Sequence, residues 1–205
     1  MTFSIPIGIL TLGEYMTKKE EILNVALNLF SKEGYDNVGV QKIADYCQIK
    51  KPTLYHYFGS KEGLLEALLE ERLNKFLLEL KELCIYKNDI VLSLDTITYH
   101  YFNFVRENPE FYRLVLNLSY APEESLCYKN ILKYILEQGT LIEKMFLKAE
   151  EQHGNMRGRS KVFALTFIGI INSSISYYFH TKDEKDLSFE SAQKISKQFR
   201  HGIFS

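Results

Sequence analysis

The stretch EGYDNVGVQKIADYCQIKKPTLYHYFGSKEGLL, residues 33–65, predicts the fold of this chain better than any other segment. Val40, Ile43 and Ala44 have the spacing of a buried stripe on one short helix. Pro52 then indicates the first turn of another helix, because proline fits there without losing a helical hydrogen bond. Two short helices joined by a turn of about three or four residues are typical of a helix-turn-helix.

Longer helices are predicted on both sides of this stretch. Upstream, Thr17 and Glu20 have the spacing of a capping box, in which each side chain accepts a hydrogen bond from the other residue's backbone N–H. Apolar residues follow at helical spacing as far as Phe30, and Gly34 can supply the left-handed end of that helix. Downstream, leucines at helical spacing predict a long helix that starts at Ser60.

The rest of the chain also predicts helices, because strand-like runs with hairpin signals are absent from the sequence. The fold class is therefore all-α with about nine helices, arranged as an N-terminal three-helix helix-turn-helix domain and a larger all-helical domain. We expect these domains at residues 16–62 and 63–205. Met16 is an alternative start to Met1, which would make residues 1–15 an N-terminal extension. The later helices are expected at 90–108, 111–118, 121–149, 161–180 and 188–201, with a polar loop at 150–160.

Composition narrows the class of protein. Hydrophobic residues make up 46% of the 205 residues, which is enough for a substantial core, and the net charge is −1. Three widely spaced cysteines argue against a disulfide framework or a zinc site, so we expect no metal and no cofactor. The apolar run at 162–179 contains Thr, Asn and Ser, which favours a buried helix over a membrane span. We expect a cytoplasmic protein that does not bind a membrane.

The helix-turn-helix stretch differs in charge from the chain as a whole. Residues 40–61 contain four lysines and one acid, Asp45. The rings of Tyr55, His56 and Tyr57 lie among those lysines. Lysines neutralise DNA phosphates and tyrosine hydroxyls donate hydrogen bonds to them, so this local pattern favours nucleic-acid binding. The plain alternative for single members, Lys42 and His56 above all, is a solvated surface.

The order of these residues resembles the DNA-binding signature of the TetR (tetracycline repressor) family of transcriptional regulators. The resemblance covers about residues 17–69 and is most specific at residues 53–62. It implies a helix-turn-helix that binds double-stranded operator DNA, joined to a helical domain that binds a ligand and forms a homodimer. The residues that it places at or near the DNA are Gln41, Lys51, Pro52, Thr53, Tyr55, His56, Tyr57 and Lys61.

The resemblance also implies separate roles within this set. Thr53, with Lys51 and Pro52, would face base edges in the major groove. Tyr55 and Lys61 would hold phosphates, while Tyr57 and Gln41 would reach bases or the backbone.

This chain departs from the family pattern at the turn and at two helix starts. Gln48 stands where the family usually has glycine, and Lys50 stands where a capping serine is usual. Gly39 and Val40 replace hydroxyl residues that cap the second helix and touch phosphate. We therefore expect weaker capping and one phosphate contact fewer, with the same type of activity.

The larger domain shows no catalytic constellation, because its histidines are scattered and no glycine-rich phosphate loop is present. We expect no enzyme. Hydroxyls and amides in an apolar helical cavity would instead suit a small apolar or aromatic effector. The resemblance implies a pocket among helices four, five, seven and eight without saying which residues line it. The alternative for the aromatic residues of this domain is a place in the ordinary core. The candidates are Tyr99, Phe102, Asn103, Tyr128, Tyr134, Phe167, Asn172 and Ser176.

The last two predicted helices have the pattern of a dimer interface. The helix at 161–180 is apolar almost all round, which a single domain cannot easily bury. Two such helices from each subunit would form a four-helix bundle across a two-fold axis. A purely internal core is the alternative. The candidate interface residues are Phe163, Phe167, Ile170, Ser173, Phe189, Ala192, Ile195 and Phe199.

These observations predict a ligand-responsive transcriptional regulator. We expect a repressor that binds a palindromic operator as a dimer and releases it when a small molecule binds the helical domain and shifts the long fourth helix, which begins at Lys61. Two alternatives stay open at this point. One is a DNA-binding regulator without a ligand, controlled by its concentration or by a protein partner. The other is a helical ligand carrier or enzyme with a vestigial head.

Overall fold

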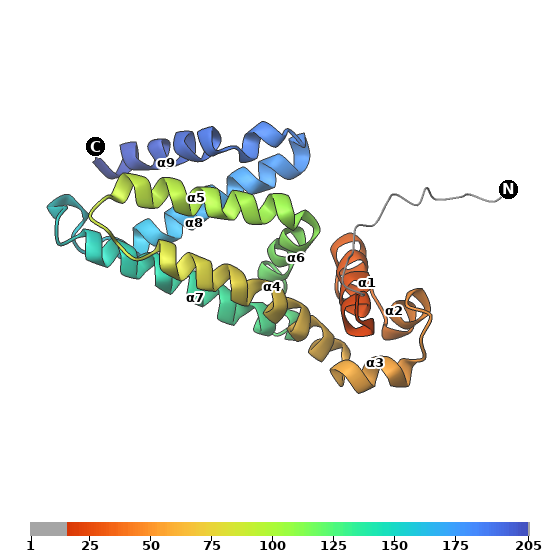
Figure 1. Cartoon of the computed structure of the whole chain (residues 1–205). Coiled ribbons are helices and arrows are strands. Elements are labelled where there is room, and N and C mark those ends of the chain that lie inside the picture. Colours follow the sequence, from red (N-terminus) through yellow and green to blue (C-terminus); the bar gives the residue numbers. More distant parts are fainter. Residues whose placement is uncertain (1–15, 205) are drawn as a thin grey trace.

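The computed structural model describes residues 16–204, so the expected extension at residues 1–15 lies outside the described residues. The described part consists of helices joined by short loops and contains no strand, which confirms the all-α class. A head made of α1, α2 and α3 lies at one end of an elongated body that contains the other helices (Figure 1). The helices are α1 (Lys18–Glu33), α2 (Val40–Tyr46), α3 (Lys51–Phe58), α4 (Lys61–Leu83), α5 (Ile90–Glu107), α6 (Pro109–Ser119), α7 (Leu126–Ala149), α8 (Ser160–Thr181) and α9 (Phe189–Phe204), with 3-10 turns η1 (Gly154–Met156) and η2 (Glu184–Leu187).

The first helix begins and ends where the capping residues predict. The Glu20 N–H donates to Thr17 Oγ1 at 3.2 Å, and the Thr17 N–H donates to Glu20 Oε2 at 2.6 Å. At the other end Gly34 adopts φ 84°, in the left-handed region that glycine enters without steric cost. Between these caps Ala26 and Phe30 are fully buried. The capping box and the glycine therefore hold α1 at a defined length beneath the helix-turn-helix.

The turn between α2 and α3 keeps its left-handed residue although glycine is absent. Gln48 has φ 53°, and the next N–H, that of Ile49, donates to the Ala44 carbonyl at 3.0 Å to close the turn. The helix starts follow the expected weakness, because neither Gly39 before α2 nor Lys50 before α3 makes a side-chain cap bond. The departures at these positions change the capping of the two helices and leave the path of the turn intact.

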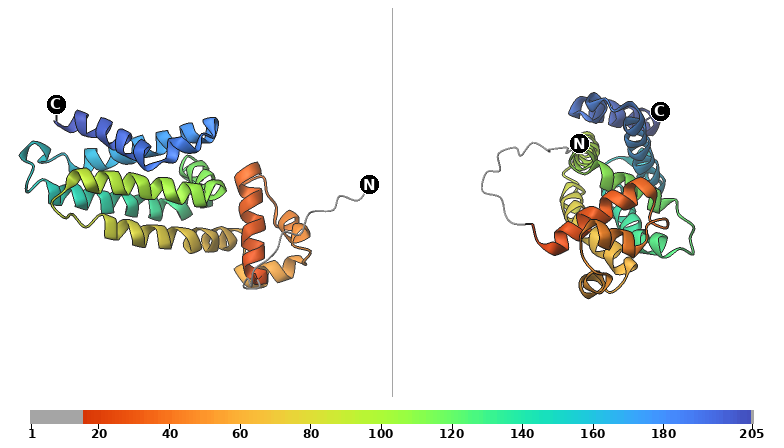
Figure 2. Two further views of the ribbon diagram at one scale, coloured as in Figure 1. Left: turned by 45° about the horizontal axis from the view of Figure 1, so that its top comes forward. Right: turned by 90° about the vertical axis from the view of Figure 1, so that its right-hand side faces the viewer.

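The fourth helix joins the head to the body without a break. Ser60 caps it by accepting the Gly63 N–H at 3.0 Å, and the helix then continues to Leu83. The expected domain boundary at residues 62 and 63 thus falls in its first turn. In the body, α7 packs against both α4 and α8, and α5 packs against α9. These body helices lie roughly along one axis, whereas α1 crosses the end of the body (Figure 2).

One helix start and two connections differ from the sequence pattern. The seventh helix begins at Leu126, because the Ser125 hydroxyl accepts the Tyr128 N–H at 3.2 Å. Pro122 belongs to a turn closed by the Ser125 N–H, which donates to the Pro122 carbonyl at 2.9 Å. The polar loop after α7 contains η1, whose Met156 is fully buried, so this connection is anchored in the core.

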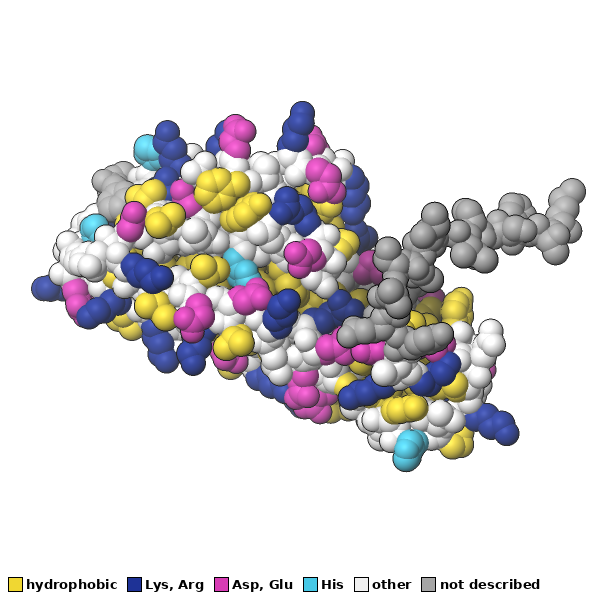
Figure 3. All heavy atoms as spheres, viewed as in Figure 1, with side chains coloured by type: hydrophobic (Ala, Val, Ile, Leu, Met, Phe, Trp, Pro, Cys, Tyr) yellow, Lys and Arg dark blue, Asp and Glu magenta, His cyan; other side chains and the backbone are white. Residues whose placement is uncertain are grey.

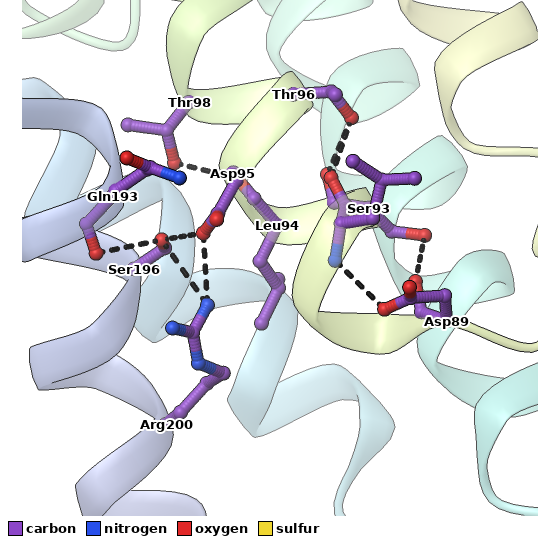
Figure 4. Close-up of polar contacts among 10 residues, drawn as sticks. Asp89, Ser93, Leu94, Asp95, Thr96, Thr98, Gln193, Ser196 and Arg200 are labelled. Carbon is purple, nitrogen blue, oxygen red and sulfur yellow. Dashed lines mark hydrogen bonds and ion pairs between the residues drawn. The ribbon is translucent and has the colours of Figure 1, made fainter. Parts of the chain in front are cut away.

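A buried polar cluster links α5 to α9 (Figure 4). Arg200 Nη1 lies 2.8 Å from Asp95 Oδ1, and the hydroxyl of Ser196 donates to the same carboxylate oxygen. Ser196 is fully buried, and Asp95 and Arg200 are largely buried. Because no sequence periodicity pairs two residues this far apart, the cluster was not predicted.

Candidate DNA interface and ligand cavity

The third helix turns its apolar residues inward and the predicted DNA residues outward. Leu54 and Phe58 are buried in the head. The residues on the other side of α3 are open to solvent, and basic side chains and an imidazole lie on the surface of the head (Figure 3). Thr53 is half-buried at the start of the helix. The exposed members of the predicted set on α3 are Lys51, Pro52, Tyr55, His56 and Tyr57.

Two further members of the set lie on neighbouring helices. Gln41 is exposed on α2, and its Nε2 donates to Asp45 Oδ1 at 2.5 Å. Lys61, the first residue of α4, has its Nζ 4.1 Å from the centre of the Tyr35 ring. Partial burial lowers the pKa of Lys61 from its ordinary value. The structure therefore adds Tyr35 to the site as the ring that positions Lys61. The sequence did not predict this role, because a single aromatic residue after a helix gives no sign of its partner.

The lysines of the head fall into two groups. Lys42 forms an ion pair with Glu33 at 2.6 Å, which agrees with its interpretation as a surface residue. Lys50 and Lys51 are exposed at the start of α3, and neither has an ion-pair partner among residues 16–204. Unpaired cations at this position can bind phosphate without first breaking an internal ion pair.

One arginine of α4 adds polar contacts between the head and the body, where α1 packs against α4 and α6. Arg72 Nη1 donates to Asn108 Oδ1 at 2.7 Å, where α5 meets α6. Its Nη2 donates to Asn24 Oδ1 of α1 at 3.2 Å. The guanidinium also lies over the ring of Phe111, with 5.7 Å between Cζ and the ring centre. Head, α4 and α6 thus meet at a single side chain.

An inner cavity of about 290 Å³ lies in the body just beyond this joint. Every residue that lines it is uncharged. Its polar groups are largely engaged within the protein, since the Tyr112 hydroxyl donates to Asn172 Oδ1 at 2.6 Å and Gln138 Oε1 accepts from the Tyr101 hydroxyl at 2.9 Å. Such a cavity suits an apolar ligand. Its lining consists of Leu73, Phe76, Phe104, Tyr112, Val115, Leu116, Ser119, Tyr120, Tyr128, Ile135, Gln138, Gly139, Leu165, Ile168 and Asn172.

The structure places the eight candidate ligand residues in different surroundings. Tyr128 and Asn172 line the inner cavity, and Ser176 lines the groove outside it. Phe102, Tyr134 and Phe167 are buried but do not line the cavity, because neighbouring helices cover their rings.

The last two candidates face away from the cavity. Tyr99 packs edge-to-face on Phe189, with 5.1 Å between ring centres, and Asn103 lines a separate hollow between α4 and α5. In their place α6 supplies much of the lining, from Tyr112 to Tyr120. Its apolar stripe looks the same whether it faces core or cavity, so the sequence could not show this. No cluster of His, Cys, Asp and Glu among the described residues could hold a metal ion.

The predicted interface residues divide into buried residues and residues that keep an accessible surface. Phe163, Phe167 and Phe199 pack around Phe146 at 5.7, 6.3 and 6.1 Å between ring centres, and Ala192 is fully buried as well. These four residues are covered by their own protomer, so they are corrected to core and cannot contact a partner directly. Phe189 packs on Tyr99 of α5 while remaining partly exposed. Ile170, Ser173 and Ile195 also keep an accessible surface, and they line a hollow between α8 and α9 together with Tyr177.

An apolar stripe along α8 remains open in the protomer. Val162, Leu165 and Tyr177 are exposed, and only a third of the most apolar window of this helix is buried. By length and composition α8 could cross a membrane. Its opposite face, however, packs against α7 inside the body, with Phe167 and Ile171 fully buried. A helix buried on one side and apolar on the other is typical of a protein–protein interface.

Comparison with known proteins gives this arrangement a family. Residues 22–68 match the family model described as bacterial regulatory proteins, tetR family. The HTH-type transcriptional activator FasR of Mycolicibacterium smegmatis is 23% identical over 188 residues, covering 92% of this chain and 83% of FasR. The negative transcriptional regulator of the biofilm operon, IcaR of Staphylococcus epidermidis, is 31% identical over 106 residues, covering 51% of this chain and 55% of IcaR.

A solved structure extends the likeness to the body. The transcriptional regulator FadR from Bacillus subtilis, solved in complex with stearoyl-CoA, superposes with a TM-score of 0.72 at 17% identity, covering 87% of this chain and 96% of FadR. At that identity the likeness shows the fold alone. The family model spans α1 to the first part of α4 and so includes the whole helix-turn-helix. The helix-turn-helix head therefore belongs to the tetR family of bacterial regulatory proteins, and the chain is a transcriptional regulator rather than an enzyme.

Proposed function

We propose that this chain is a cytoplasmic repressor that binds a palindromic operator as a homodimer and releases it when an apolar small molecule enters the inner cavity. Residues 16–62 bind DNA, and residues 63–205 bind the effector and form the dimer. One observation carries the proposal. The cavity is uncharged and is walled by α4 and α6, and these are the two body helices that pack against α1 of the head.

This geometry supports a mechanism for release. Leu73 and Phe76 of α4 line the cavity, and the same helix begins at Lys61 on the DNA side. A ligand that widens the cavity displaces α4 or α6, and Arg72 carries that displacement to α1 through Asn24. In a dimer the spacing between the two recognition helices changes as a result. Coupling of about 1–3 kcal/mol lowers operator affinity about 5- to 150-fold.

The chemistry of the cavity supports a particular class of effector. A hydrocarbon chain suits an uncharged lining whose polar groups are largely engaged within the protein. FadR of Bacillus subtilis, which shares the fold, was solved with stearoyl-CoA. We therefore propose a fatty-acyl compound as the effector of this chain, which refines the small apolar or aromatic molecule expected from the sequence. The cavity also argues against a regulator without a ligand, which would have a filled core.

Repression, rather than activation, is supported by IcaR, a negative regulator that shares 31% identity over 106 residues. FasR is a transcriptional activator, so the sign of regulation is itself an outcome to test. Val162 and Tyr177 on the exposed side of α8, together with Ile170 and Ile195, form the proposed dimer surface.

Filling the cavity tests the ligand part of this proposal. Gly139 of α7 lines the cavity, and a Cβ built there meets nothing within 4 Å. Gly139→Leu is expected to keep operator affinity and to abolish release of operator DNA by lauroyl-CoA, measured by fluorescence anisotropy of labelled DNA from upstream of the gene. Thr140→Leu, which adds the same side chain at an exposed position of α7, is the control and should respond like the wild type. A normal response from Gly139→Leu would refute the assignment of the cavity.

A further inference from the structure

A larger groove lies on the surface of the body beside the inner cavity. This groove, about 810 Å³, lies between α6 and α8 and shares part of its lining with the cavity. The two spaces are therefore neighbours. The shared residues are Leu116, Tyr120, Leu165, Ile168 and Asn172. Unlike the cavity, the groove also has charged and polar side chains, among them Arg113, Asn117 and His180.

Two cations lie against one aromatic ring at the end of this groove. Arg113 Cζ is 4.8 Å from the centre of the Phe179 ring, and Lys182 Nζ is 5.1 Å from the same centre. No carboxylate among residues 16–204 forms an ion pair with either cation. Two like charges held around one ring repel each other, and an anion bound beside them offsets that repulsion. The positive charge is a local feature of this surface, since the chain as a whole carries a net charge of −1.

The same two cations border a second hollow, next to the DNA-binding head. This hollow, about 400 Å³, is lined by Arg113 and Lys182 together with Ser31 and Lys32 of α1. Pro109 and Glu110 of α6 complete it, and Glu110 is its one acidic side chain. Arg113 thus borders both the groove beside the inner cavity and the C-terminal end of α1.

We propose that Arg113 and Lys182 bind the anionic group of an amphiphilic effector whose apolar chain occupies the inner cavity. This inference rests on the proposed function and adds to it the polar half of the ligand and its orientation. A guanidinium binds a carboxylate or a phosphate through two parallel hydrogen bonds, and a lysine ammonium contributes a further charge. An anion bound here also lies close to Lys32 of α1. The ligand therefore acts on the head through its charge as well as through the volume that its chain occupies.

The test compares three ligands that share a twelve-carbon chain and differ in their polar group. Isothermal titration calorimetry measures the binding of lauroyl-CoA, laurate and 1-dodecanol to the full-length dimer. Arg113→Met keeps an apolar side chain against Phe179 and removes the charge, and Lys182→Met does the same on the other cation. Arg106→Met is the matched control, because Arg106 also lies against a ring, that of Tyr99, but does not line the groove. Arg113 lines the groove, and Lys182 lines the adjoining hollow beside α1. Thermal unfolding verifies that each variant folds.

The expected result is a loss that depends on the charge of the ligand. Arg113→Met weakens an anionic ligand about 10-fold and leaves 1-dodecanol unchanged, while Arg106→Met alters none of them. A loss confined to lauroyl-CoA supports the proposal with phosphate as the recognised group, and a loss for laurate as well supports a general anion site. Equal losses for all three ligands, or no loss for any, overturn the proposal and leave the proposed function standing. If no ligand binds the wild type, the effector part of the proposed function fails too.

Discussion

Removing the carboxylate of Asp95 should destabilise the protein strongly. The side chains of Asp95 and Arg200 are only 9% and 15% exposed, and they join α5 to α9 across 2.8 Å (Figure 4). Asp95→Ala leaves the guanidinium of Arg200 charged and largely buried without its partner, and the hydroxyl of Ser196 loses its acceptor. Breaking a buried pair in this way costs about 3–5 kcal/mol. Because Arg200 keeps some contact with water, we expect the lower end, about 3 kcal/mol.

The measurement is urea unfolding at one fixed protein concentration, because the stability of a dimer depends on concentration. For a chain of this length a loss of about 3 kcal/mol corresponds to a fall in Tm of about 6–12 °C. Glu190→Ala is the control. Its partner Lys194 lies 2.6 Å away on α9, but the two side chains are 75% and 72% exposed, so solvent screens the pair and its loss should hardly change the urea midpoint.

A double variant separates the ion pair from the rest of the packing. Asp95→Leu with Arg200→Met replaces both charges by apolar groups, which is often neutral or stabilising for a buried pair. We therefore expect it to recover most of the stability that Asp95→Ala loses. The reasoning is refuted if Asp95→Ala costs no more than Glu190→Ala, or if the double variant is less stable than Asp95→Ala.

Five further outcomes are expected. Thr53→Ala should lower operator affinity by about 1–3 kcal/mol per half-site and spare binding to random DNA, as measured by anisotropy on both DNAs. Lys61→Ala should weaken binding to both DNAs and reduce the slope of log K against log salt by about one unit per lost contact; an unchanged slope argues against its phosphate role. Ile195→Glu should split the dimer and weaken operator binding together, so a dimer that persists in sedimentation places the interface elsewhere. His100 has a pKa below its ordinary value of 6.5 because it is buried, so the unfolded chain binds the proton more readily and stability should fall as the pH drops below 6.5. His100→Phe, which can still stack on the neighbouring ring, should flatten that fall in the urea midpoint. Gln48→Gly should raise the free energy of unfolding by up to about 1 kcal/mol, because glycine adopts the left-handed conformation of residue 48 without the steric cost that a side chain brings. A lower urea midpoint would mean that the contacts of the Gln48 side chain matter more than this cost.

Local chemistry explains why the head could be predicted closely. The Thr17 capping box and Gly34 act on neighbouring backbone groups, so the sequence alone determines where α1 begins and ends. Leu54 and Phe58 lie four residues apart, and that spacing requires one inward face on α3. The outward position of the DNA residues follows from the inward position of these two.

The body was predicted less well because its decisive contacts are not local. The stripe that contains Ala192 and Phe199 shows that one face of α9 is buried, but periodicity does not show whether the same protomer or a partner covers it. Here the same protomer does. The cavity depends in the same way on where side chains from five helices fail to fill space. Asp95 and Arg200 are joined only by the fold.

The position of Arg72 makes a long relay between effector and DNA unnecessary. Arg72 directly precedes Leu73, which lines the inner cavity, so one turn of α4 both walls the cavity and binds Asn24 of the head. The guanidinium has a buried Nε without a hydrogen-bond partner in the described structure, and its other nitrogens depend on Asn108 and Asn24. The bond from Nη1 to Asn108 is partly buried, and a buried donor that loses its acceptor costs about 1–3 kcal/mol, whereas water can replace the exposed bond to Asn24. That cost is of the same size as the coupling needed to release an operator. Pressure on Leu73 from the chain that we propose to bind here would therefore either move Arg72 with α4 or break its bond to Asn108.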